Sequence, residues 1–269
     1  MFSFMPNRSM KIKTKFAVLL AFMWLATAIN SPADGNSPAS PILVELFTSE
    51  GCSSCPPADA WLQQIDTSQP APGAQIIVLS EHVDYWDHDG WKDPHSSHAL
   101  TERQNEYARK LGLSTPYTPQ LIVDGTSEVH LNDAEETKRT FEKAATAPAI
   151  PLRLTAISRD GGSPEVIQAH VEADGSSAKN NADVFVAVAI DHVESQVAKG
   201  ENAGKHLTHV AVVESLEKIG TLKKGKTFDQ DIRLKLKPGT DSASLRVIAF
   251  LQESGPGRIV GGALERSNK

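Results

Sequence analysis

Cysteine and basic residues are both scarce in this sequence. Only two of its 269 residues are cysteines, which excludes a small scaffold held together by many disulfides. The 27 Lys and Arg residues are outnumbered by 33 Asp and Glu residues, and the net charge is −6. Four basic residues and no acidic residue fall within residues 1–28, so the rest of the chain carries a charge of −10. We therefore expect no nucleic-acid partner, because such a protein needs a basic face.

Long apolar runs are also missing, apart from one near the N-terminus. This run, Phe16–Ala28, follows three lysines and ends in the small residues Ala26-Thr27-Ala28. Its 13 residues are fewer than the roughly 20 that a membrane span needs, and they suit the apolar part of a signal peptide. We predict that residues 1–28 are a signal peptide, with an uncleaved anchor as the alternative. The protein is then secreted or periplasmic, and it is not membrane-embedded after signal removal.

The two cysteines are close together, as Cys52-Ser53-Ser54-Cys55. A disulfide that closes so short a loop restrains the unfolded chain by only about 2 kcal/mol, against nearly 5 kcal/mol for a loop of about 100 residues. A chain of this length can build its own core and does not need so weak a staple. The pair therefore favours redox chemistry, while a structural disulfide and a metal site remain alternatives.

The residues around the cysteines predict a strand, a turn and a helix. The apolar run Ile42–Phe47 has strand character, and Ala58, Trp61, Leu62 and Ile65 have helical spacing after Pro56-Pro57. Proline is tolerated in the first turn of a helix, so the helix begins at the cysteine pair. A strand, Cys-x-x-Cys and a helix form the thioredoxin arrangement. The helix N-terminus favours a thiolate, and we assign Cys52, nearer the exposed turn, as the nucleophile and Cys55 as the resolving thiol.

A second strand, Gln75–Ser80, follows the helix and predicts a parallel strand pair. The loop after it, His82–Pro94, then leaves the sheet at the same edge as the cysteines. We expect His82 to relay protons or to stabilise a thiolate, and Asp84 to orient His82 or to take a proton from Cys55. Its aromatic residues Tyr85, Trp86 and Trp91 are expected to form an apolar lip for a partner polypeptide, although they suit packing equally well.

The same residues allow a metal-binding interpretation. Cys52 and Cys55 supply two soft ligands, His82 or His88 a third, and Asp84 a fourth, a set that suits Cu(I) or Zn. A single Cys-x-x-Cys is a weak zinc signal, because structural zinc sites commonly use two such pairs.

The rest of the first half predicts two helices and a hairpin. Their expected extents are His98–Gly112 for one helix, Gln120–Val123 turned by Asp124-Gly125 for the hairpin, and Asn132 or Asp133 through Ala145 for the other helix. In a thioredoxin-type sheet the strand Gln120–Val123 starts beside the cysteines. We predict a cis Thr118–Pro119 bond there and count Pro119 with the catalytic residues and Thr118 with the supporting ones.

Several blocks of this sequence resemble a known family. The blocks are Val44–Asp59, His82–Asp87 with Gly90–Pro94, Tyr117–Gln120, and Gly200–Asn202 with Leu207–His209. They are similar to an uncharacterised family of secreted proteins with a thioredoxin-like fold, domain of unknown function 1223. The resemblance implies this fold and export. It implies no reaction, since none is established for the family.

The second half changes in character near Pro148. Alternating apolar residues around Ile167–Ala173 and Ile232–Leu236, and continuous apolar runs at Val184–Ile190 and Leu245–Leu251, predict short strands. We therefore predict an α/β thioredoxin-like domain over residues 42–147, after a linker over 29–41, and an all-β, β-sandwich-like domain over 148–265. His206 and His209 lie three residues apart on an extended chain, which puts them on opposite faces and disfavours a shared metal ion.

These observations favour an exported thiol–disulfide oxidoreductase that acts through a mixed disulfide on protein thiols or disulfides, without a cofactor. A periplasmic copper-handling protein that uses Cys52, Cys55 and His82 is the first alternative. A non-catalytic partner-binding module is the second.

Overall fold

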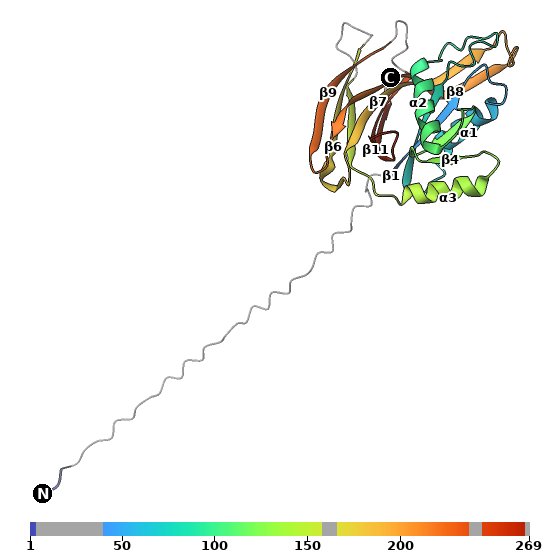
Figure 1. Ribbon diagram of the computed structural model, residues 1–269. Helices are drawn as coiled ribbons and strands as arrows, with labels where there is room; N and C mark the ends of the chain where they lie inside the picture. Colours follow the sequence, from blue (N-terminus) through green and yellow to red (C-terminus); the bar gives the residue numbers. More distant parts are fainter. Residues whose placement is uncertain (4–39, 158–165, 237–243, 267–269) are drawn as a thin grey trace. The chain divides into compact units, whose positions relative to one another are not determined.

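The structure, a computed structural model, describes residues 1–3, 40–157, 166–236 and 244–266 (Figure 1). Residues 4–39 lie outside the described part, and with them most of the expected signal peptide (1–28) and linker (29–41). The segment Pro38–Lys269 forms one compact unit. None of the described helices is both long enough and apolar enough to cross a membrane.

Strands dominate the described residues, which also contain three α-helices. The helices are α1 (Pro56–Ser68), α2 (His98–Leu111) and α3 (Ala134–Ala145), with a 3₁₀ turn η1 at Gly175–Ser177. The strands are β1 (Ser40–Thr48), β2 (Ala74–His82), β3 (Gln120–Val123), β4 (Ser127–Val129), β5 (Leu152–Ile157), β6 (Val166–Asp174), β7 (Ala182–Gln196), β8 (His206–Leu222), β9 (Thr227–Lys235), β10 (Leu245–Glu253) and β11 (Ile259–Arg266).

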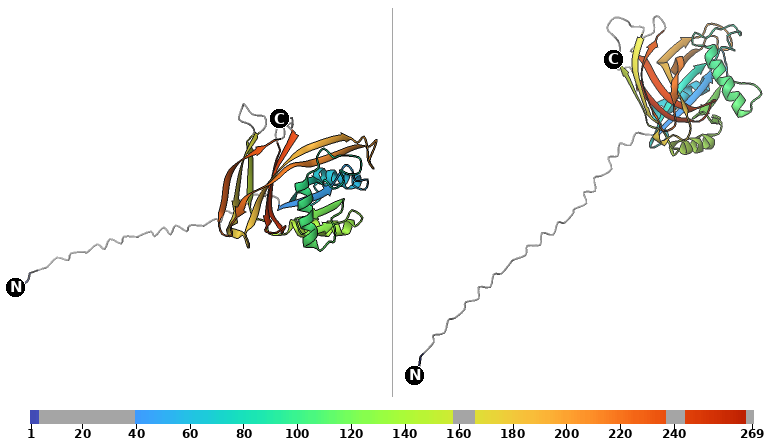
Figure 2. Two further views of the ribbon diagram at one scale, coloured as in Figure 1. Left: turned by 45° about the horizontal axis from the view of Figure 1, so that its top comes forward. Right: turned by 60° about the vertical axis from the view of Figure 1, so that its left-hand side comes forward.

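The fold class predicted from the sequence, a thioredoxin-like α/β domain followed by a separate β-sandwich-like domain, is wrong. One mixed sheet of eight strands, in the order β11-β10-β7-β8-β2-β1-β3-β4, takes strands from both halves of the chain. The joint lies where β8 pairs in parallel with β2, with Val212 opposite Ser80. A smaller sheet, β5-β6-β9, packs on the part of the large sheet that the second half supplies, away from the helices (Figure 2).

The continuous apolar runs of β7 and β10 explain this arrangement. Along β7, Val184, Val186 and Val188 face the apolar cluster shared with the smaller sheet. The alternate residues Ala187 and Ala189 belong to the cluster shared with the helices. A strand buried on both faces is apolar throughout, and such a run does not indicate which strands pair with it on either side. The sequence therefore predicted the strands and missed their partners.

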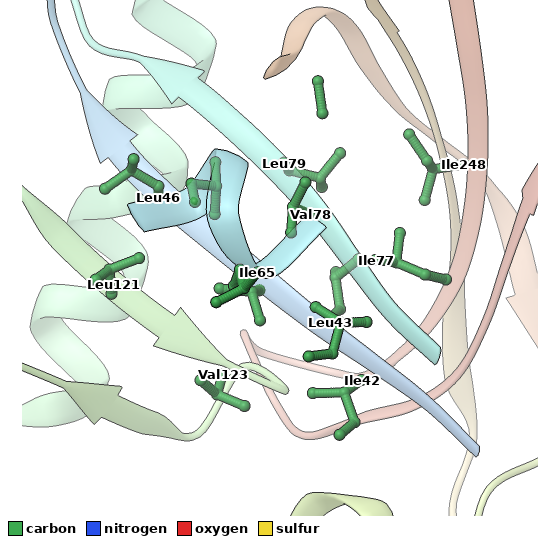
Figure 3. Close-up of a cluster of buried hydrophobic side chains, with 14 of the residues drawn as sticks. Ile42, Leu43, Leu46, Ile65, Ile77, Val78, Leu79, Leu121, Val123 and Ile248 are labelled. Carbon is green, nitrogen blue, oxygen red and sulfur yellow. The ribbon is translucent and has the colours of Figure 1, made fainter. Parts of the chain in front are cut away.

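The main core contains residues from both halves of the chain. Figure 3 shows side chains of β1, β2 and β3 together with Ile65 of α1 and Ile248 of β10. The shared core follows from the sheet order, because β10 and β2 lie in the same eight-stranded sheet.

Most of the local predictions for the first half are confirmed. Strands β1 and β2 are parallel, α1 begins with a proline in its first turn, and β3 runs antiparallel to β1. Helix α2 ends at Gly112, which has a positive φ of 71°, and the side chain of Asp133 caps α3 by accepting a hydrogen bond from the Glu136 N–H. Each of these signals depends on residues close in sequence.

An ion pair between the halves yields a test of this architecture. Arg246 on β10 donates to both carboxylate oxygens of Asp66 on α1, at 2.7 and 2.8 Å, and also binds Asp191. Its side chain is 3% exposed, whereas Arg266, which approaches the same two carboxylates, is 49% exposed. Removing one partner of a buried pair leaves an uncompensated charge.

We predict that Arg246→Leu lowers the free energy of unfolding by about 3 kcal/mol, measured by urea denaturation. The matched change Arg266→Leu should cost less than about 1 kcal/mol, because exposed ion pairs contribute little. Equal losses for the two variants would contradict the buried link between α1 and β10.

Candidate functional site

Cys52 and Cys55 form a disulfide between the end of β1 and the start of α1. The sulfur atoms are 2.11 Å apart, and the Cα atoms are 5.4 Å apart. Cys55 is the N-cap residue of α1, and its carbonyl accepts hydrogen bonds from the Ala58 and Asp59 N–H groups. The predicted position of the cysteine pair, between a strand and a helix, is therefore confirmed.

The expected exposure of Cys52 is wrong, because both cysteines are completely buried, at 0% exposure. A turn from the second half covers them. The Asn202 side-chain amide donates to the carbonyls of Glu50 and Cys52 at 2.8 and 2.9 Å, and the Ser53 N–H donates to the Glu201 carboxylate at 3.2 Å. We call residues Gly200–Asn202 the covering turn. A prediction that assigned the second half to a separate domain was unable to anticipate it.

His82, at the end of β2, forms a buried pair with Asp93. The His82 Nδ1 atom lies 2.7 Å from Asp93 Oδ2, and the same oxygen accepts the Glu50 N–H at 2.8 Å. The other oxygen of Asp93 accepts the His95 N–H at 2.9 Å. Burial alone would raise the pKa of Asp93, but the His82 imidazole and these hydrogen bonds outweigh it and hold the pKa far below its usual value.

Asp84 does not orient His82, contrary to one of the roles predicted for it. Its carboxylate accepts a hydrogen bond from the Thr101 hydroxyl at 2.6 Å and lies 3.1 Å from His98 Nδ1. Both partners are in the first turn of α2, so Asp84 fastens the loop after β2 to that helix. Asp84 was predicted as the partner of His82 because it is close to it in sequence. In the structure the loop folds back, so that Asp93 is the residue that contacts His82.

The tryptophans of this loop are half-buried and are held by polar contacts. The Trp86 indole N–H donates to the Thr118 hydroxyl at 2.7 Å, and the Trp91 indole N–H donates to Glu50 at 2.8 Å. A Cβ atom placed on Gly51 would come within 3.1 Å of Trp86 Cβ, which shows how closely this loop packs on the turn before Cys52. Trp86 and Thr118, both expected as supporting residues, are thus hydrogen-bonded to each other.

Pro119 lies at the start of β3, and the predicted cis peptide bond Thr118–Pro119 is confirmed. The next residue, Gln120, pairs with Phe47 near the end of β1. Because the cysteines follow β1, Pro119 lies at the same end of the sheet as the disulfide.

His209, on β8, completes the site and was not assigned to it from the sequence. Its ring centroid is 4.8 Å from that of His82, its Nδ1 atom is 3.4 Å from Asp59 Oδ1, and its Nε2 atom is 3.9 Å from Glu50 Oε1. The predicted opposite facing of His206 and His209 holds, since His206 is exposed and His209 is buried. The signal available in the sequence was the block Leu207–His209, which resembles the family.

We call Glu50, Asp59, His82, Asp93 and His209 the buried acid–base cluster; all five side chains are buried. Burial lowers the pKa of His209, but the contact with Asp59 and the charges of Glu50 and Asp93 raise it overall. Among the described residues, five polar atoms of the cluster make no hydrogen bond: Glu50 Oε1, Asp59 Oδ1, His82 Nε2 and both ring nitrogens of His209. Buried polar atoms are normally paired, so these five atoms call for an explanation.

The residues proposed for copper are not assembled as a ligand set. Cys52 and Cys55 are bonded to each other, and His82 uses Nδ1 to contact Asp93. Within the described ranges, no group of three or more His, Cys, Asp or Glu side chains is arranged to hold a metal ion. His88, the other imidazole considered, is exposed.

Residues 43–252 match the protein family described as protein of unknown function DUF1223. This chain belongs to that family. The predicted family is thus confirmed. The thioredoxin-like fold class that the resemblance implied is wrong, because one mixed eight-stranded sheet contains strands from both halves of the chain.

Several solved structures are similar to this chain. A crystal structure of a protein from Agrobacterium tumefaciens is 27% identical, covers 85% of this chain and 95% of its own, and has a TM-score of 0.65. The sporulation control protein Spo0M of Bacillus subtilis is 11% identical over 45% of this chain and 49% of its own, with a TM-score of 0.33. A domain of the outer membrane lipoprotein Omp28 of Porphyromonas gingivalis is 13% identical over 45% of this chain and 89% of its own, with a TM-score of 0.29. No curated protein matches this chain.

The raised pKa of His209 gives a pH-dependent stability. Because folding favours the charged imidazole, this contribution is complete below the usual pKa of 6.5 and is lost as the pH rises through the higher folded pKa. We predict that His209→Gln has a lower free energy of unfolding than the wild type at about pH 6, measured by urea denaturation. The difference between the two proteins should shrink as the pH is raised toward about 9. The exposed His206→Gln should show no such trend, and a pH-independent loss in His209→Gln would contradict the charged state.

Proposed function

We propose that this protein is an exported thiol–disulfide oxidoreductase whose reacting group is the Cys52–Cys55 disulfide. The observation that carries the proposal is the position of that disulfide. The only two cysteines of the chain are bonded to each other at the start of α1, between Glu50 in the preceding turn and Asp59 one helical turn after Cys55, both of which belong to the buried acid–base cluster. A structural staple would close a larger loop, and it would not need uncommitted imidazole and carboxylate atoms next to it.

The proposed reaction moves two electrons between the cysteine pair and a partner protein. In the reducing direction, the Cys52 thiolate attacks a sulfur of the partner's disulfide, forms a mixed disulfide and expels one partner thiolate. The Cys55 sulfur then attacks Cys52 Sγ, releases the second partner thiolate and leaves the Cys52–Cys55 disulfide. Oxidation of a partner dithiol follows the same steps in reverse.

The surroundings of the two sulfurs support these roles. Cys52 Sγ lies 3.4 Å from the hydroxyl of Ser54, an exposed residue of the intervening turn. Cys55 is the N-cap of α1, where the helix dipole favours negative charge; Pro56 and Pro57 have no N–H, and the Ala58 and Asp59 N–H groups donate to the Cys55 carbonyl. Cys52 is followed by the exposed residues Ser53 and Ser54, where we expect a partner to approach, and Cys55 lies at the helix.

Exchange requires the covering turn to open, because both sulfurs are buried. Three hydrogen bonds join the turn to the cysteine loop: two from Asn202 and one to Glu201. Each of the two buried Asn202 hydrogen bonds contributes about 0.5–1.5 kcal/mol, so breaking both costs on the order of 1–3 kcal/mol. A minor open population of this size is compatible with catalysis, and a docking partner can stabilise it.

We predict that Cys55→Ser accumulates a mixed disulfide with a peptide disulfide substrate and that Cys52→Ser does not. The reason is that only Cys55 can resolve the intermediate that Cys52 forms. Non-reducing mass spectrometry of the quenched reaction measures the adduct. The two variants are matched controls for each other, because each retains one thiol of the same loop.

If both variants retain full exchange activity, the proposed reaction is excluded. If reduced wild-type protein exchanges no disulfide but binds Cu(I) stoichiometrically, and His82→Ala abolishes that binding, the copper-handling alternative is correct instead. If neither reaction occurs, the partner-binding module is the remaining alternative.

A further inference from the structure

Asp59 lies one helical turn from Cys55 and faces the same way. The Asp59 N–H donates to the Cys55 carbonyl at 3.1 Å, and Cys55 itself has helical backbone angles, with φ −77° and ψ −35°. Residues four apart on a helix are neighbours on one face, with Cβ atoms about 5–6 Å apart. Both side chains are buried, so both point from α1 toward the interior.

His209 contacts Asp59 from the opposite side of this interior space. Asp59 Oδ1 and His209 Nδ1 are 3.4 Å apart, an ion-pair contact, and within the described part of the chain neither Asp59 Oδ1 nor either ring nitrogen of His209 makes a hydrogen bond. A purely structural pair would be expected to satisfy these atoms, since each unpaired buried polar atom costs about 1–3 kcal/mol. Uncommitted atoms in this position are suited to receiving and returning a proton.

Burial favours such a proton acceptor. In the closed protein Cys55 is completely buried, so a thiolate there is poorly solvated. A carboxylate on the same helix face can exchange a proton with this sulfur without depending on water that enters when the covering turn opens.

We propose that Asp59 carries the proton to and from the sulfur of Cys55 and that His209 supplies and stores it; this inference rests on the proposed oxidoreductase function. During resolution, the Cys55 thiol gives its proton to the Asp59 carboxylate as its sulfur attacks Cys52 Sγ. In reverse, when the Cys52–Cys55 bond breaks, its electron pair goes to Cys55 Sγ. Asp59 then protonates that sulfur, and the His209 imidazolium reprotonates Asp59.

Titratable groups of the neighbouring elements face His209, and the carboxylates among them raise its pKa. They are Asp59 from α1, Glu50 from the turn before Cys52, His82 from β2 and Asp93 from the loop after β2. Asp93 is committed to His82 and to backbone N–H groups, and Glu50 accepts the Trp91 indole N–H. Asp59 is therefore the carboxylate of this group that both contacts His209 and shares a helix face with Cys55.

The test follows the two steps separately in reduced full-length protein after mixing with 5,5′-dithiobis(2-nitrobenzoate). Attack by Cys52 releases one coloured thiolate, and resolution by Cys55 releases a second one. We expect Asp59→Asn to leave the first phase unchanged and to slow the second phase on the order of 100-fold at neutral pH. The slowing should fade at high pH, where Cys55 ionises without help.

His209→Gln should slow the same second phase, and Asp59→Glu should restore part of its rate. The exposed His206→Gln on the same strand is the control and should change neither phase. Thermal denaturation followed by circular dichroism checks that each variant is folded.

The outcomes separate this inference from the function on which it rests. An absent first phase in the wild type overturns the oxidoreductase function and the inference with it. A normal first phase with a second phase that Asp59→Asn does not slow, or slows equally at all pH values, overturns the proton-transfer role of Asp59 alone.

Discussion

The carboxylate of Asp93 is the constraint on which the geometry of the site depends. It binds the His82 imidazole and the backbone N–H groups of Glu50 and His95, and so joins the end of β2, the turn before Cys52 and its own loop. The His82 and Asp93 side chains are both fully buried, where hydrogen bonds to a carboxylate are strong and a carboxylate left without partners is costly. Asp93 therefore fixes the His82 imidazole and the backbone of Glu50 relative to each other.

The second half of the chain completes the site. Strand β8 enters the sheet next to β2 and brings His209 to within ion-pair distance of Asp59. The loop before β8 supplies the covering turn, whose Asn202 is hydrogen-bonded to the carbonyls of Glu50 and Cys52 in the buried cysteine loop. One structural element therefore supplies both His209 and the covering turn. In the proposed function, this element would provide an acid–base group and would have to move for a substrate to reach the cysteine pair.

The sequence predicted what depends on neighbouring residues. The helix after Pro56-Pro57, the Gly112 cap, the Asp133 cap and the cis bond before Pro119 all follow from local chemistry, and all are confirmed. The order of strands in the large sheet was missed. The apolar run of β7 indicates a strand buried on both faces, but it does not determine which strands lie beside it. Asp93 and His209 were missed for a related reason: a loop that folds back and a strand from the other half bring them to His82. The blocks that resemble the family include both Asp93 and His209, but a resemblance in sequence does not show which side chains contact each other.

The most direct test of the account is the reduction potential of the Cys52–Cys55 disulfide, measured by equilibration in glutathione buffers followed by alkylation and mass analysis. An oxidoreductase pair should be half reduced at a potential between about −120 and −270 mV, the range of catalytic thiol–disulfide proteins. A disulfide that stays closed at potentials below about −300 mV behaves as a structural bond, and it would contradict the exchange function.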